Sequence, residues 1–229
     1  MTAIIEEFEY LDYVKDRHFR RQADNNRKDF VNSFPIEKIP DLSLEEYLIG
    51  KKGIGTEQSF CRRMRYNLSD SASLGNVRFD IFGIYYDSNG NVALSKTFRN
   101  MFGDDTSSAF EYIKKEIIAV LKAAEEEDYP RIVSSKLNSS FRYKLITVYY
   151  PDKYVPVVTN SVLNEYCRHV GLSVNPNEPM IYRNLALREW KDHTYETCDW
   201  SNIKLMRFCD WLWRSNCYLK LGAANTDVR

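Results

Sequence analysis

The segment F-C-R-R-M-R-Y carries residues that could bind nucleic acid. Arg62, Arg63 and Arg65 are followed directly by Tyr66. Guanidinium groups contact phosphates and stack on bases, and a tyrosine ring offers a π-face to a base. The same residues are also compatible with a solvated helix face that pairs with the abundant acids of the chain. Both interpretations remain open at the level of sequence.

Further basic and aromatic residues follow the arginine cluster and can extend it if their segments pack nearby. Tyrosines in tandem place one ring on each side of a strand, so one ring of the pair is expected in the core. The candidates for DNA contact in this region are Arg78, Tyr85, Tyr86, Lys96 and Arg99.

The turn Pro151-Asp152-Lys153 bears a partial likeness to a metal-dependent nuclease pattern. That pattern uses two carboxylates to hold Mg²⁺ and a lysine to orient the attacking water. Here Lys153 follows Asp152 immediately instead of lying on a later strand beside a second acid, so a simple turn is favoured. We expect Lys153 and Tyr154 to be exposed on this turn, where they are further candidates for DNA contact.

Established catalytic motifs are absent from the sequence. K-K-G-I-G-T at 51–56 lacks the lysine and the setting of a phosphate-binding loop, and neither H-E-x-x-H nor G-x-S-x-G occurs. The three histidines are scattered, and the five cysteines include no C-x-x-C pair. These features predict neither a metal site nor a cofactor, and they favour a reduced, cytoplasmic setting over a disulfide framework.

The chain-wide numbers limit the classes of protein. The 229 residues carry 32 Lys and Arg against 32 Asp and Glu, so any polyanion must be bound by a local patch and not by an overall basic field. The N-terminus M-T-A-I-I-E-E is acidic where a signal peptide is basic, and no run approaches the roughly 20 apolar residues of a membrane span. We expect a protein that is neither secreted nor embedded in a membrane.

Hydrophobic periodicity predicts an α+β fold that is mostly helical with a small antiparallel sheet. The sheet consists of a hairpin near 77–97, with strands near 77–86 and 91–97 around S-N-G-N, plus a strand near 143–150 in K-L-I-T-V-Y-Y. The run from 107 to 127 is the clearest amphipathic helix, and Ser43 with Glu46 predicts a capping box for a short helix over 44–49.

The remaining pattern predicts helices near 128–135, 160–171, 179–190 and 201–213. In terms of domains, we expect a helical N-terminal arm over 1–34, a single compact α+β domain over 35–217, and a frayed tail over 218–229.

Several segments, taken in order, resemble a known family. They are F-V-N-S-F-P-I-E-K-I-P-D-L-S-L-E-E-Y, S-F-C, F-G-I-Y-Y, F-G-D-D-T-S-S-A-F-E-Y-I-K-K-E-I-I, K-L-I-T-V-Y-Y-P-D-K-Y-V-P-V and W-S-N-I-K-L-M-R-F-C-D-W-L-W. Together they cover about residues 30–213 and look like the region upstream of the AAA+ motor in McrB-like restriction proteins.

The resemblance implies a specificity module without the motor or the nuclease. In that family the upstream region recognises target DNA, often through a modified base, while the motor hydrolyses GTP and works with a McrC-type nuclease subunit. The expected partners are therefore duplex DNA, an AAA+ motor and a McrC-type nuclease. No catalytic residue is transferred to this chain by the resemblance.

Two other classes of function compete with DNA recognition. The Trp-rich C-terminal helices could instead form a protein-interaction or oligomerisation module of a defence complex. A stand-alone enzyme would have to assemble its site from scattered acids, namely Asp80, Asp87, Asp104, Asp105 and Asp152. Acids at turns and helix N-termini already act as caps, which makes the enzyme the weakest of the three hypotheses.

Overall fold

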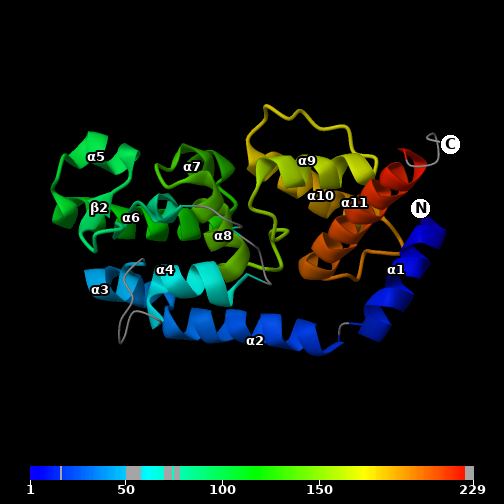
Figure 1. Cartoon of the computed structure of the whole chain (residues 1–229), viewed down its shortest axis with the longest axis horizontal. Helices are drawn as coiled ribbons and strands as arrows, with labels where there is room; N and C mark the ends of the chain where they lie inside the picture. The colour runs from blue at the N-terminus through cyan, green and yellow to red at the C-terminus, as the bar shows by residue number, and fades with distance from the viewer. Residues whose placement is uncertain (16, 50–57, 70–73, 75–77, 225–229) are drawn as a thin grey trace. The chain divides into compact units, whose positions relative to one another are not determined.

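The computed structural model describes residues 1–15, 17–49, 58–69, 74 and 78–224 (Figure 1). Within them the chain is mostly helical with one two-stranded antiparallel sheet, which confirms the predicted α+β class. Backbone contacts divide the chain into two compact units: unit 1 comprises Met1–Arg20 and Pro151–Arg229, and unit 2 comprises Arg21–Tyr150. These boundaries differ from the expected 1–34, 35–217 and 218–229, and the single domain over 35–217 stays a prediction.

Unit 2 holds the sheet and helices that lie on both sides of it in the sequence. Its elements are α2 (Arg17–Ser33, from Arg21 onward), η1 (Ile36–Asp41), α3 (Leu44–Tyr47), α4 (Phe60–Arg62), η3 (Arg63–Asn67), η4 (Phe79–Phe82), β1 (Ile84–Tyr86), β2 (Val92–Leu94), α5 (Lys96–Phe102), α6 (Thr106–Glu126), α7 (Tyr129–Ser134) and α8 (Ser139–Tyr149).

Helix α6 is the element around which unit 2 packs. The Asp105 carboxylate accepts a hydrogen bond from the Ser108 amide and so begins the helix, and Glu127 ends it in the left-handed conformation. Its apolar face, which includes the fully buried Ile113 and Ile117, contacts α5, α7, α8, η1 and both strands. The predicted helix over 107–127 and the Ser43–Glu46 capping box are both confirmed.

The sheet is shorter than the predicted hairpin. Ile84 pairs with Leu94 and Tyr86 with Val92, while residues 79–82 form a 3₁₀ helix and 96–102 form α5. Gly83 separates η4 from β1 at φ +86°, and a Cβ there would lie 2.7 Å from the Phe98 ring and 2.8 Å from Ile113. Residue 77, the expected start of the first strand, lies outside the described residues.

The predicted strand near 143–150 is wrong, because these residues belong to helix α8. The Asn138 side chain accepts from the Ser140 amide at the helix start, and Tyr149 is the last helical residue. Every residue from Phe141 to Val148 is buried, including Arg142, Lys144 and Thr147, so no exposed polar face marks the helical period of the segment. Packing against α6 overrides the β-branched composition.

Unit 1 is helical throughout its described elements. They are α1 (Thr2–Lys15), α9 (Asn160–His169), α10 (Met180–His193) and α11 (Asn202–Ala224). Helix α11 packs against α1 and α9, and α9 also packs against α10. Residues 218–224 of the expected frayed tail are helical as part of α11, and 225–229 lie outside the described residues.

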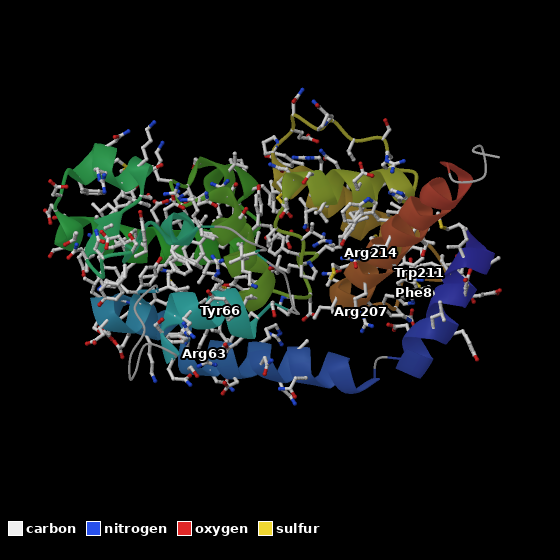
Figure 2. The ribbon with its side chains drawn as sticks, viewed as in Figure 1. Phe8, Arg63, Tyr66, Arg207, Trp211 and Arg214 are labelled. Atoms are coloured by element: carbon white, nitrogen blue, oxygen red, sulfur yellow. The ribbon has the colours of Figure 1, made fainter. Side chains whose placement is uncertain are left out.

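Phe8 anchors α1 to the rest of unit 1. Its ring is 4% exposed and lies 5.3 to 5.7 Å from the ring centroids of Trp200, Phe208 and Trp211. Figure 2 shows Phe8 beside Trp211. Ion pairs from Glu9 to Lys204 at 2.7 Å and from Asp12 to Arg207 at 2.8 Å flank this contact. Buried aromatic contacts flanked by ion pairs therefore hold α1, near the N-terminus, against residues near the C-terminus.

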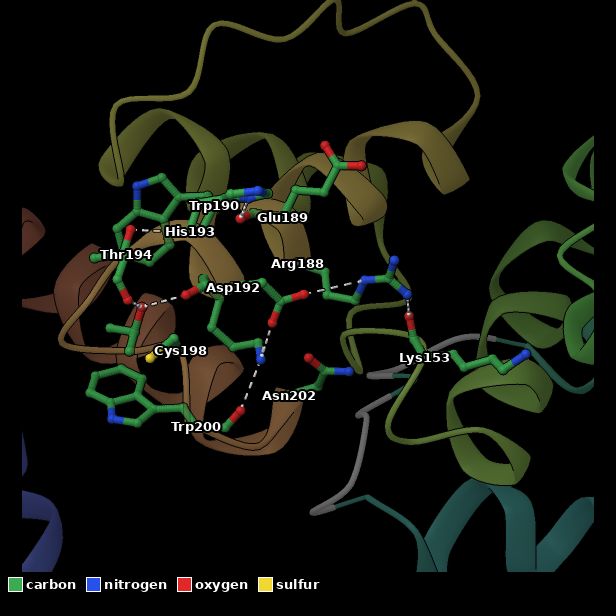
Figure 3. A network of polar contacts seen from close by, with 12 residues as sticks. Lys153, Arg188, Glu189, Trp190, Asp192, His193, Thr194, Cys198, Trp200 and Asn202 are labelled. Atoms are coloured by element: carbon green, nitrogen blue, oxygen red, sulfur yellow. Dashed lines mark hydrogen bonds and ion pairs between the residues drawn. The ribbon is translucent and has the colours of Figure 1, made fainter.

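Both units use buried or half-buried cationic side chains to satisfy backbone carbonyls. In unit 2 the Lys144 ammonium, in a side chain that is 0% exposed, donates to the Leu68 carbonyl at 2.6 Å. In unit 1 Arg188 donates to the Lys153 carbonyl and Lys191 to the Trp200 carbonyl, with Asp192 beside both cations (Figure 3). These basic residues therefore have structural roles.

We expect Lys144→Met to lower the free energy of unfolding by about 1–3 kcal/mol, because it leaves the Leu68 carbonyl without this donor while keeping the apolar stem. Urea unfolding measures the change. The matched control is Lys122→Met on the exposed face of α6, which should stay within about 0.5 kcal/mol of the native chain. Equal losses in the two variants would contradict the structural role.

Gly83→Ala should lower the free energy of unfolding by about 2–4 kcal/mol, from left-handed backbone strain and the clash with Phe98 and Ile113. Gly90→Ala is the control, because Gly90 has φ +80° and no atom within 4 Å of the added Cβ. It should lose only about 1–2 kcal/mol from backbone strain. Indistinguishable urea midpoints would show that the close approach at Gly83 is unimportant.

Candidate nucleic-acid interface

The arginine cluster lies on α4 and the π-helix η3, and its apolar residues fix which side chains face outward. Phe60, Cys61, Met64 and Leu68 are all 0% exposed. They hold one face of the segment in the core of unit 2, and burial raises the pKa of the Cys61 thiol well above its ordinary value. The opposite face presents Tyr66, which is 47% exposed.

Arginine and aromatic side chains alternate on this outer face. The Arg62 guanidinium carbon lies 5.2 Å from the centroid of the Tyr66 ring, and that of Arg65 lies 5.4 Å from the same centroid. Arg65 also lies 4.9 Å from the centroid of Phe79. We call these four residues, Arg62, Tyr66, Arg65 and Phe79, the guanidinium–aromatic ladder. Each contact is within the range of cation–π attraction, so the ladder holds its guanidinium groups in place.

A pocket of about 400 Å³ adjoins the ladder. It is formed by η4, β1 and the hairpin turn, together with one residue of η3. Its lining residues are Arg65, Arg78, Phe79, Asp80, Tyr85, Tyr86, Asp87 and Ser88. Four of the residues predicted from sequence to contact DNA, Arg65, Arg78, Tyr85 and Tyr86, therefore come together in one pocket.

The two acids at the pocket are engaged with their surroundings. The Asp80 carboxylate pairs with Arg78 at 3.4 Å, in side chains that are 33% and 82% exposed. One Asp87 carboxylate oxygen accepts from the amides of Asn89 and Asn91, each at 2.9 Å, and so shapes the turn. An exposed ion pair of this kind contributes little to stability, so Arg78 can exchange Asp80 for a ligand anion at small cost.

Arg63 has a different role from its neighbours. Its side chain points toward α2, where it pairs with Asp29 at 2.6 Å and lies 5.7 and 5.6 Å from the Phe30 and Phe34 ring centroids (Figure 2). Only 6% of Arg63 is exposed. The structure thus assigns this residue to packing between α2 and η3, and its contact with DNA stays a prediction.

The other predicted contacts are spread over different elements. Lys96 and Arg99 are exposed on α5 and not on the expected second strand. Lys153 and Tyr154 belong to unit 1. Tyr154 is 1% exposed, so its expected exposure on the turn is wrong, and Lys153 is half-buried with its carbonyl accepting from Arg188. None of these four residues lines the pocket.

Sequence reasoning missed Phe79, which connects the ladder to the pocket. The predicted strand near 77–86 placed Phe79 in a regular alternation, whereas it lies on η4 against Arg65. One signal in the sequence could have indicated Phe79. It is an aromatic residue that directly follows Arg78, in a segment that precedes a glycine.

Of the acids of the enzyme hypothesis, Asp80 and Asp87 line the same pocket, and Asp105 lies at the start of α6. Asp105 caps α6, and Asp80 and Asp87 have the contacts given above. Among the described residues, no group of three or more His, Cys, Asp or Glu side chains is placed to hold a metal ion. The same residues include no helix that is long and apolar enough to span a bilayer.

Comparison of the chain with protein families, curated proteins and solved structures finds no match. The resemblance to the region upstream of the motor in McrB-like proteins therefore stays a prediction from the sequence.

The contrast between Arg63 and Arg65 gives a test of the interface. Arg63→Ala should lower the free energy of unfolding by about 1–3 kcal/mol, because it removes a buried side chain that packs on two rings and pairs with Asp29. Arg65→Ala should lower it by less than about 1 kcal/mol. Urea unfolding of both variants decides the matter, and the reverse order would contradict the assignment.

Proposed function

We propose that this chain is a DNA-binding recognition module that binds through the guanidinium–aromatic ladder and its pocket. The observation that carries the proposal is the ladder itself: two half-buried arginines held against the exposed Tyr66 and the half-buried Phe79. A guanidinium that stacks through its face donates hydrogen bonds through its edge, which suits it to phosphate oxygens. The exposed Lys96 and Arg99 on α5 supply additional positive charge in the same unit.

The resemblance gives this binding activity its setting. We propose that the module serves a McrB-like, modification-dependent restriction system in the cytoplasm, and that it acts with an AAA+ motor and a McrC-type nuclease subunit. In this role the chain selects duplex DNA and performs no catalysis. Such a module needs positive residues that bind the DNA phosphate backbone and a concave surface that contacts the target bases. Unit 2 has both features.

The alternative of a protein-interaction module gains no specific support from the tryptophans. Trp200 is buried, and Trp190, Trp200 and Trp211 all contact Phe208 within unit 1. Rings that fill the core of their own unit have less surface to offer a partner.

The double variant Arg62→Ala/Arg65→Ala tests the proposal. Fluorescence anisotropy with a labelled duplex, unmodified or containing 5-methylcytosine, should show binding by the native chain that weakens as salt rises. If each arginine contacts one phosphate, the double variant should flatten the slope of log K against log salt by roughly 1–2. Lys122→Ala on α6 is the matched control for loss of an exposed positive charge elsewhere in unit 2.

Absence of salt-dependent binding by the native chain at low salt, on either duplex, would reject the proposal. An unchanged slope in the double variant would reject the ladder as the contact surface. Urea unfolding of the variant confirms that any loss arises at the surface and not from a destabilised core.

A further inference from the structure

The ladder and the pocket share Arg65 and Phe79, which makes them one continuous surface. Arg65 lies between two rings, with Tyr66 at 5.4 Å and Phe79 at 4.9 Å, and both Arg65 and Phe79 line the pocket. A ligand that enters the pocket therefore meets the same guanidinium group that contacts Tyr66. The surface offers two places for a flat ring: the pocket itself and the face that includes the half-exposed Tyr66.

Phosphate binding alone requires neither the pocket nor the exposed Tyr66 ring. Arginines on a flat surface suffice to follow the backbone of a duplex, whose bases present edges and not faces to a protein. Aromatic rings and guanidinium planes become useful when a base is unpaired and its π-face is accessible. The pocket volume of about 400 Å³ also falls in the range of roughly 300–1,000 Å³ that is typical of sites for small planar ligands.

The polar groups of the pocket suit the remaining parts of a nucleotide. Arg78 is 82% exposed and pairs only loosely with Asp80, so its guanidinium can reach a phosphate at the rim. The Asp80 carboxylate and the Ser88 hydroxyl can accept hydrogen bonds from the edge of a base. The pocket thus combines aromatic walls, cations and acceptors within one small volume.

We infer that this surface binds consecutive unpaired bases of a DNA strand, with one base in the pocket and its neighbour over Tyr66. The inference rests on the proposed function, because it assumes that the ladder is the DNA-binding surface. It goes further by naming unpaired bases as the part of the DNA to which this surface binds most tightly, while paired duplex is bound more weakly and through its phosphates. Stretches of unpaired DNA, such as gaps, bulges and forks, present the same chemistry.

The test compares four probes with the full native chain: a labelled 12-nucleotide single strand, the same strand with adjacent abasic sites that keep the phosphates, the matched duplex, and deoxyadenosine monophosphate as a competitor. The single strand should bind at least about tenfold more tightly than the duplex at equal salt. Abasic sites should weaken binding by roughly 5- to 150-fold for each base that stacks.

Tyr66 provides the residue-level test, because its exposed ring can be removed without opening the core. Tyr66→Ala should weaken single-strand binding by roughly 5- to 150-fold with the salt slope unchanged, and Tyr66→Phe should keep native affinity because stacking needs only the ring. Tyr10→Ala is the matched control, since Tyr10 is 71% exposed on α1 of unit 1. It should leave single-strand binding unchanged.

Three results would overturn the inference: duplex binding as tight as single-strand binding, native affinity in Tyr66→Ala, or displacement of the strand by the monophosphate at concentrations comparable to its own. The last result would identify a site for free nucleotides. If duplex binding still depends on salt and on Arg62 and Arg65, the proposed function stands and only this inference fails. If the native chain binds no DNA probe at low salt, both fail.

Discussion

Hydrogen bonds from buried cations to backbone carbonyls fasten helix ends, and the residues that follow them, to neighbouring helices. In unit 2 the Lys114 ammonium donates to the carbonyls of Pro40 and Leu42, at 2.7 and 3.3 Å, and so fastens the end of η1 to α6. Arg142 of α8 donates to Val133 and Ser135 at the end of α7, where helix carbonyls have no partner within the helix. An ionised donor strengthens each bond, and the low polarity around it makes loss of the donor costly.

This use of cations changes what the composition says about function. The chain has as many basic as acidic residues, but several of the basic ones are buried against carbonyls and have no access to a ligand. A polyanion can therefore be bound only by a local group of basic residues at the surface. Arg63 and Arg65 are separated by one residue, yet Arg63 packs between helices and Arg65 lies between the exposed Tyr66 ring and the half-buried Phe79 ring. The helical turn decides which arginine is structural, and the residue type alone does not.

The sequence predicted the type of an element well where only one face of that element is buried, and less well where the element is buried on all sides. Helix α6 has a clear apolar face and an acidic N-cap, and its extent was predictable. Helix α8 is buried on all sides, so its β-branched and aromatic residues looked like a strand, and only its packing on α6 reveals the helix. Similarly, the arginine cluster was found by residue type, whereas the burial of Tyr154 and the contact of Phe79 with Arg65 depend on residues distant in sequence.

The position of Phe79 depends in turn on how the hairpin is fixed. Gly83 lets the backbone between η4 and β1 approach Phe98 of α5 and Ile113 of α6. The pocket therefore rests on elements that pack closely within unit 2. An arginine side chain loses roughly 2 kcal/mol of rotamer entropy when it is immobilised, and stacking on Tyr66 and Phe79 accounts for part of that loss before any ligand arrives. Preorganised guanidinium groups can thus give a protein without net charge a local affinity for phosphate and exposed bases.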